Sequence, residues 1–122
     1  MNRKSLRYLW IYSAADEEVV EWHEMLIRRR RERGYDVRGL CITPPGLKRR
    51  WLPFPELDRR WRRGDPALIR LYRSVLEEIR DRDVLILYNG ANLHPDFARA
   101  LPLIRVYSAA DDPESTGILS LP

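Results

Sequence analysis

Three carboxylates stand close together near the end of the chain, in the run Asp111-Asp112-Pro113-Glu114-Ser115. Carboxylates at this spacing repel one another, which favours protonation of one of them. Such a group can act as a general base or bind sugar hydroxyls. The same run also fits the start of a helix, with Asp112 as the N-cap, Pro113 at the first helical position and Glu114 in the first turn. Capping and binding are compatible, and both interpretations stay open.

Other polar residues follow the predicted strands directly. Ser13 follows the first strand, Asn89 and Gly90 open the turn after the strand Val84–Tyr88, and His94 ends that turn. Ligands of open parallel sheets bind at the carboxyl ends of the strands, where the connections diverge. We therefore expect these residues to contact a substrate. A cap for the short helix that follows is the simpler role for His94.

One pentapeptide occurs twice, as Tyr12-Ser13-Ala14-Ala15-Asp16 and as Tyr107-Ser108-Ala109-Ala110-Asp111. Both copies follow a predicted strand, and their small residues allow a ligand to approach the backbone. Two strand-to-helix caps explain the repeat better than a shared function does.

Cations and aromatic rings are interleaved in the middle of the chain. The segment from Arg28 to Arg63 holds thirteen Lys or Arg against four Asp or Glu, so it carries +9, while the rest carries −5. Such a segment suits single-stranded nucleic acid, through stacking and phosphate contacts, and it equally suits an anionic membrane or polymer surface. The residues expected to contact it are Arg49, Arg50, Trp51, Arg59, Arg60 and Trp61. No RNA-binding signature accompanies them, so nucleic acid is not the partner we expect. The alternative is a solvated loop whose rings pack on the sheet.

Several classes of site lack the residues they need. A single cysteine, Cys41, excludes an internal disulfide framework and a Cys-cluster metal site, and His23 and His94 lie too far apart in sequence for metal-ligand spacing. The chain has no glycine-rich dinucleotide fingerprint, no P-loop and no Gly-x-Ser-x-Gly elbow. We expect no metal and no cofactor bound by this domain. Cys41 is expected in the core, and His23 is expected in the core or at its boundary.

The apolar runs are short. Val84–Tyr88 is far below the length of a membrane span, and the first residues resemble a secretory signal only weakly, because Arg7 interrupts them. We expect a cytoplasmic protein.

Apolar periodicity predicts alternating strands and helices. The expected strands are Leu6–Tyr12, Asp36–Ile42, Val84–Tyr88 and Leu103–Tyr107. The expected helices are Asp16–Arg33, a short one at Glu56–Arg62, one opened by Asp65 and Pro66 with an apolar stripe to Ile79, and His94–Leu101.

This alternation is typical of an α/β, Rossmann-like, three-layer fold with a parallel sheet of about four strands. The expected strand order is 2-1-3-4, or 3-2-1-4 if the proline-rich insert at residues 44–64 hides a strand. With 122 residues, we expect one domain over residues 1–122.

Part of the chain resembles a known family. The runs Asp83-Val84-Leu85-Ile86-Leu87-Tyr88-Asn89-Gly90, Leu93-His94-Pro95 and Arg105 to Ser115 are similar to the N-terminal domain of GT-B fold glycosyltransferases, in particular the spore-maturation CgeB-like group. The resemblance covers mainly residues 83–115. At the first strand Ser13-Ala14-Ala15-Asp16 replaces the glycine-rich turn common in such enzymes.

The resemblance implies an acceptor-side domain of a longer enzyme that transfers sugar from a nucleotide-sugar donor to an acceptor. A C-terminal donor-binding domain would follow, and this domain alone would be inactive. Asp111, Asp112 and Glu114 would line the cleft between the domains, with Asn89, Gly90 and His94 opposite and Asp112 as the base. A partial domain exposes strand edges, so we also expect a homodimer.

Two alternatives come from other functional classes. One is a non-catalytic α/β binding module that uses the arginine- and tryptophan-rich surface on an anionic partner. The other, weaker on these residues, is a flavodoxin-like flavin carrier.

Overall fold

The computed structural model describes residues 3–14, 16–42 and 52–108. Its strands are β1 (Arg7–Tyr12), β2 (Asp36–Cys41), β3 (Val84–Tyr88) and β4 (Ile104–Ser108). Its α-helices are α1 (Glu17–Glu32), α2 (Phe54–Arg62), α3 (Pro66–Glu78) and α4 (Pro95–Ala100), and two 3₁₀ turns are η1 (Arg3–Ser5) and η2 (Asn89–Asn92). The predicted elements are confirmed, with α2 beginning two residues earlier than expected.

The four strands form one parallel sheet in the order β2-β1-β3-β4. Tyr12 pairs with Cys41, Ile11 pairs with Leu87, and Tyr88 pairs with Ser108, so the carboxyl ends of all four strands lie at one edge. The first of the two expected orders is therefore the one observed among the described strands. Residues 43–51, where a hidden strand was considered, lie outside the described residues.

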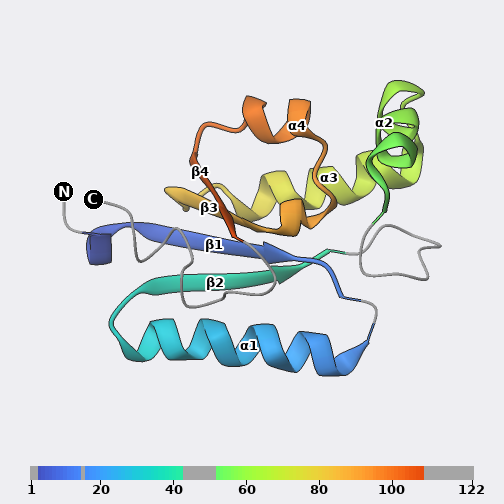
Figure 1. The fold of residues 1–122 in the computed structure, drawn as a ribbon. Coiled ribbons are helices and arrows are strands. Elements are labelled where there is room, and N and C mark those ends of the chain that lie inside the picture. Colours follow the sequence, from blue (N-terminus) through green and yellow to red (C-terminus); the bar gives the residue numbers. More distant parts are fainter. Residues whose placement is uncertain (1–2, 15, 43–51, 109–122) are drawn as a thin grey trace.

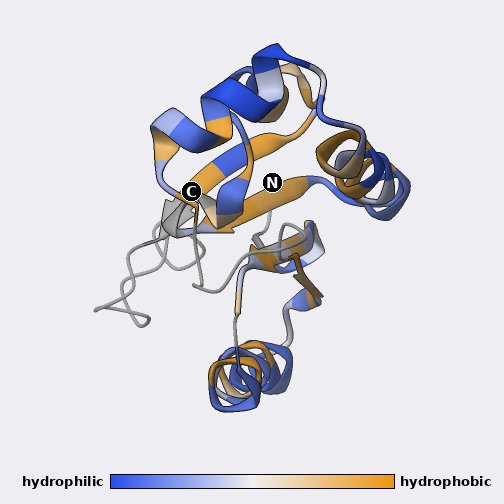
Figure 2. Cartoon of the chain, turned by 90° about the vertical axis from the view of Figure 1, so that its right-hand side faces the viewer, coloured by the Kyte–Doolittle hydropathy of each residue, from blue (hydrophilic) through white to orange (hydrophobic). Residues whose placement is uncertain are grey.

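Helices cover both faces of the sheet, which gives three layers (Figure 1). On one face α1 packs over Trp10, Val37 and Ile86. On the other face α2, α3 and α4 enclose a second core, which includes Leu9 of β1 and Leu85 of β3. Figure 2 shows hydrophobic residues gathered where the strands and helices meet. The strand β3 is buried along its whole length, as expected of a strand covered on both faces.

Local sequence explains where the helices begin and end. Asp16 caps α1 by accepting a hydrogen bond from Val19 N at 3.0 Å, and Glu17 and Glu18 complement the helix dipole in the first turn. Gly34 follows α1 with φ +96°, a conformation that glycine adopts without strain. Asp65 caps α3 through Ala67 N at 2.9 Å. These caps confirm the predicted boundaries.

The prediction that Cys41 lies in the core is wrong, because Cys41 is exposed. It ends β2, which has a neighbour on only one side among the described strands, and Val37 is the one fully buried residue of β2. The prediction for His23 is confirmed: its ring is buried against Tyr12, and Trp10 Nε1 donates to its Nδ1 at 3.1 Å.

None of the helices in the described ranges combines the length and the apolar character needed to cross a bilayer.

Candidate functional site

The crevice between β1 and β3 is the natural place for a ligand in this sheet. From β1 the chain turns into α1 on one face, whereas from β3 it turns into α4 on the opposite face. The loops after these two neighbouring strands therefore diverge at the carboxyl edge. The residues that follow them are Ser13 and the turn η2. The structure thus brings together two of the segments that the sequence predicted for a site.

Asn92 joins the two loops. Its Nδ2 donates a hydrogen bond to Ser13 Oγ at 2.7 Å, and its Oδ1 accepts one from Leu52 N at 2.7 Å. Asn92 is buried, with 6% of its surface exposed. A buried amide with both ends engaged fixes the geometry around it, because each lost hydrogen bond leaves a desolvated group. The β1 loop, the β3 turn and the segment entering α2 are held by this one side chain.

The β3 turn has an unusual backbone. Ala91 and Asn92 have φ values of 51° and 59°, in the left-handed region. Asparagine tolerates this region, but alanine pays about 1–2 kcal/mol there. Ala91 is also buried, at 2% exposure. Strain of this kind persists where surrounding contacts over-determine it, and it is concentrated at functional sites.

Tyr72 of α3 holds the turn η2 and the residues after it through its hydroxyl group. Its hydroxyl donates to the carbonyl oxygen of Asn92 at 2.6 Å and accepts from His94 N at 2.9 Å. Burial raises the pKa of Tyr72 to about 12, against the opposing effect of the hydrogen bond from His94 N. The hydroxyl therefore stays protonated at neutral pH and keeps its donor role.

His94 is held at both ring nitrogens. Nδ1 accepts a hydrogen bond from Asp96 N at 3.1 Å, so the ring proton is on Nε2, which lies 2.8 Å from Asp58 Oδ1. The first contact caps α4, which confirms the predicted capping role. His94 is buried, and Trp61 stacks on its ring with a 4.9 Å centroid separation and an 11° interplanar angle. In this structure the ring positions the turn, and a direct contact with a substrate stays a prediction.

Asp58 links this turn to α2. Its Oδ1 faces His94 and its Oδ2 accepts from Arg62 Nε at 2.8 Å. The hydrogen bond from His94 is the largest effect and lowers the pKa of Asp58; burial opposes it, and the hydrogen bond and charge of Arg62 lower the pKa further. The carboxylate is therefore ionised at neutral pH, and it keeps the Nε2-protonated tautomer of His94 in place.

Several predicted site residues lie outside the described residues, or have only their backbone described. Outside are Asp111, Asp112, Glu114, Arg49, Arg50 and Trp51. The backbones of Asn89 and Gly90 lie in η2, at the crevice. Their contacts with a ligand stay predictions.

The described residues of the predicted anionic-partner surface lie in α2, where each arginine lies beside an acid. Arg59 and Arg60 pair with Glu56, the latter at 3.3 Å. Trp61 is not a freely exposed ring, because it packs on His94 and near Tyr72. The side chain of Arg59 is largely exposed, so its pair is weak and screened by salt and leaves Arg59 able to meet an anion, whereas the pair of Arg60 with Glu56 is half-buried. The anionic-partner surface stays a prediction.

Three residues that build the site carry no strong sequence signal. Asn92 is one of two asparagines in an ordinary turn sequence, Tyr72 belongs to the apolar stripe of α3, and Asp58 is an acid in a segment with excess positive charge. Only the contact of each with a residue at least twenty positions away reveals its role.

The described residues contain no cluster of His, Cys, Asp or Glu that would hold a metal ion. Comparisons with protein-family models, with curated proteins and with solved structures find no match for this chain.

Proposed function

We propose that this chain is the acceptor-side domain of a GT-B glycosyltransferase, with the acceptor held in the crevice between the β1 and β3 loops. The observation that carries the proposal is the bonded pair Ser13 and Asn92, which ties the two loops together where an open parallel sheet binds ligands. The left-handed backbone at Ala91 and Asn92 supports it, because such strain marks functional turns.

The register of β4 adds a second argument. Ser108 pairs with Tyr88 at the carboxyl edge, three positions before Asp111 in the sequence. The run from residue 83 to residue 115, which resembles the glycosyltransferase family, thus includes both β3 and β4, the turn η2 at the crevice and the acidic residues. The proposal needs β3, η2, β4 and the acidic residues to follow one another in this order, and they do so in the sequence.

The proposed chemistry is transfer of a sugar from a nucleotide-sugar donor. The acceptor hydroxyl oxygen forms a bond to the anomeric carbon, and the bond from that carbon to the diphosphate oxygen breaks. The nucleoside diphosphate leaves with the electron pair, and the hydroxyl proton passes to Asp112. The donor would be held by a second domain, and this domain would supply no cofactor.

The same proposal includes a cytoplasmic location and self-association. β4 has a neighbour on one side only among the described strands, and Ile104 on it is 52% exposed. An open strand edge favours pairing with a second copy or with further strands. Sedimentation at low concentration distinguishes a dimer from a monomer.

The test uses the complete gene product with a panel of nucleotide sugars, and measures nucleoside diphosphate release. Asp112→Asn should lower turnover at least a hundredfold, the size of effect typical of a lost general base, with little change in the melting temperature Tm. Glu77→Gln, a change at an exposed acid on α3, is the matched control and should leave both unchanged.

Three results would count against the proposal. If Tm falls in Asp112→Asn while turnover per folded molecule is unchanged, Asp112 is a helix cap only. If no nucleotide sugar is consumed, the transferase proposal fails. If instead the chain binds anionic vesicles with an affinity that falls steeply with salt, the non-catalytic binding module replaces it.

A further inference from the structure

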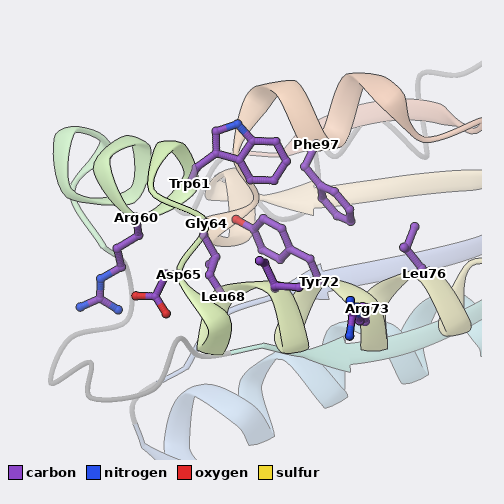
Figure 3. A pocket seen from close by; sticks show the side chains of 10 residues that line it. Arg60, Trp61, Gly64, Asp65, Leu68, Tyr72, Arg73, Leu76 and Phe97 are labelled. Atoms are coloured by element: carbon purple, nitrogen blue, oxygen red, sulfur yellow. The ribbon is translucent and has the colours of Figure 1, made fainter.

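A cleft lies in the helical layer, apart from the switch point between the β1 and β3 loops. It has a volume of about 250 Å³ and lies between α2, α3 and α4 (Figure 3). Its apolar walls are Trp61, Leu68, Ile69, Tyr72, Leu76 and Phe97. The proposed function makes no use of this cleft.

Aromatic rings form a preformed wall. Tyr72 and Phe97 stack at 4.4 Å with an interplanar angle of 19°, and Trp61 lies 5.9 Å from Tyr72. Figure 3 shows Trp61 and Phe97 reaching from α2 and α4 toward Tyr72 on α3. The hydroxyl of Tyr72 is already bonded to Asn92 and His94, so Tyr72 offers the cleft its ring. This wall suits a flat or apolar body.

The apolar surface continues to the mouth of the cleft. Ile69 and Leu76 are 40% and 44% exposed, and they are two of the four large hydrophobic side chains that are exposed among the described residues. An exposed apolar patch beside a concave aromatic surface, rimmed by charges, is typical of a ligand groove.

The charges at the rim leave one cation available. Asp65 caps α3 through Ala67 N and pairs with Arg63, and Arg60 pairs with Glu56. Arg73 of α3 also lines the cleft and is exposed, and it forms no hydrogen bond or ion pair with any described residue. A guanidinium with free donors binds a carboxylate or phosphate in bidentate fashion.

We propose that this cleft binds a small ligand with an aromatic or apolar body and one anionic group, which pairs with Arg73. The volume is below that of cavities for drug-sized ligands, which limits the body to about one fused bicyclic ring. Carboxylate and phosphate share the chemistry that Arg73 recognises, and the experiment separates them.

The test is a titration of the ¹⁵N-labelled full chain, followed by NMR. The probes are 1-naphthoate, 1-naphthyl phosphate and neutral 1-naphthalenemethanol. The Trp61 indole N–H signal, assigned with Trp61→Phe, is the reporter. We expect its shift, and those of the amides of Ile69 and Arg73, to saturate at lower concentration with one of the anions than with the alcohol, by about fivefold, as one exposed ion pair provides.

Matched variants on α3 test where the anionic group and the apolar body of the ligand bind. Arg73→Gln should remove the preference for the anion and leave the affinity for the alcohol unchanged. Arg70→Gln is an equal change of charge at an exposed position that does not line the cleft, and it should keep the preference. Leu76→Ser should weaken all probes alike.

The proposal is overturned if no probe produces saturable shifts at the cleft. It is also overturned if anion and alcohol bind equally in the parent protein, or if Arg70→Gln and Arg73→Gln weaken anion binding equally. A preference for naphthoate or for naphthyl phosphate that depends on Arg73 supports it and identifies the anionic group. None of these outcomes depends on transferase activity.

Discussion

Asn92 Nδ2 lies 2.7 Å from Ser13 Oγ, which places a hydrogen bond between two loops that are 79 residues apart in the chain. The bond crosses the point where the chain leaves neighbouring strands toward opposite faces of the sheet. Since Asn92 also accepts from Leu52 N, one amide holds three segments at the proposed site. The relative placement of these three segments therefore depends on the side chain of Asn92.

Replacing Asn92 should separate the contribution of the side chain from that of the backbone. Asn92→Ala should lower the free energy of unfolding by about 3 kcal/mol, because it leaves buried groups unpaired and puts alanine at a left-handed φ of 59°. Asn92→Gly loses the same hydrogen bonds without the backbone strain, so it should be about 1 kcal/mol more stable than Asn92→Ala. Urea unfolding of both variants measures the difference. Equal stabilities would show that the backbone at this position is not strained for alanine.

The pair His94 and Asp58 should give an acid-sensitive contribution to stability. The folded-state pKa of Asp58 is lowered, so its stabilising effect is complete above the unfolded pKa of about 4 and is lost as pH falls through the folded value. Asp58→Asn should lower Tm at pH 7 and make the decline of Tm below pH 4 shallower. Arg62→Gln, which keeps His94 as a partner of Asp58, should give a smaller change in that decline.

Nitrogen chemical shifts of the imidazole ring test the same pair directly. At neutral pH the ring of His94 should show a protonated Nε2 and an unprotonated Nδ1, since Asp96 N donates to Nδ1. A predominance of the other tautomer would contradict both the cap and the contact with Asp58.

An ion network at the opposite edge of the sheet should be a structural element of the domain. Arg82 is buried and donates to Asp36 at 2.9 Å, to Asp81 and to the carbonyl of Tyr8. Arg82→Ala should cost about 2 kcal/mol in unfolding free energy, because a backbone carbonyl in the core loses its donor. Arg80→Ala, at an exposed neighbour, should stay within about 0.5 kcal/mol of the parent.

The network also has its own pH window. Hydrogen bonds from Arg82 and then Arg38 lower the pKa of Asp81 to about 2. Its contribution is therefore present above about pH 4 and is lost between about pH 4 and pH 2. In Arg82→Ala the melting temperature should fall less steeply over that window than in the parent. An unchanged slope would show that Asp81 is not stabilised by Arg82.

Periodicity and caps predict the fold well because they are local. The apolar run of β3 and the Asp65-Pro66 start of α3 determine their elements without reference to distant residues. The strand order follows because right-handed crossovers allow few arrangements of alternating strands and helices. The exposure of Cys41 could not be predicted in the same way, because it depends on β2 lying at the end of the described sheet.

The site is less predictable because its contacts join distant positions. His94 faces Asp58 across 36 positions, and Asp58 lies in a segment whose composition emphasises arginine and tryptophan. The capping role of His94 was predictable from Pro95 alone, whereas its partner at Nε2 required the packing of α2 on α4. Polar residues after a strand thus indicate where a site lies, and tertiary packing determines which of them are free to act.

A methyl group added at Gly39 on β2 should collide with Ile27 of α1, and a shorter side chain at position 27 should relieve the collision. A Cβ at this position would lie 2.6 Å from Ile27 Cδ1 of α1, and Ile27 is buried. Gly39→Ala alone should therefore cost about 1–2 kcal/mol through overpacking, and Ile27→Val alone about 1 kcal/mol. In the double variant Cδ1 is absent, and the nearest remaining atom of the parent side chain is Cγ1 at 4.0 Å. Alanine loses less conformational entropy than glycine when a strand folds. The double variant should therefore be at least as stable as Ile27→Val. Urea unfolding of all four proteins measures the coupling. Additive losses would mean that β2 moves away from α1 to admit the methyl group.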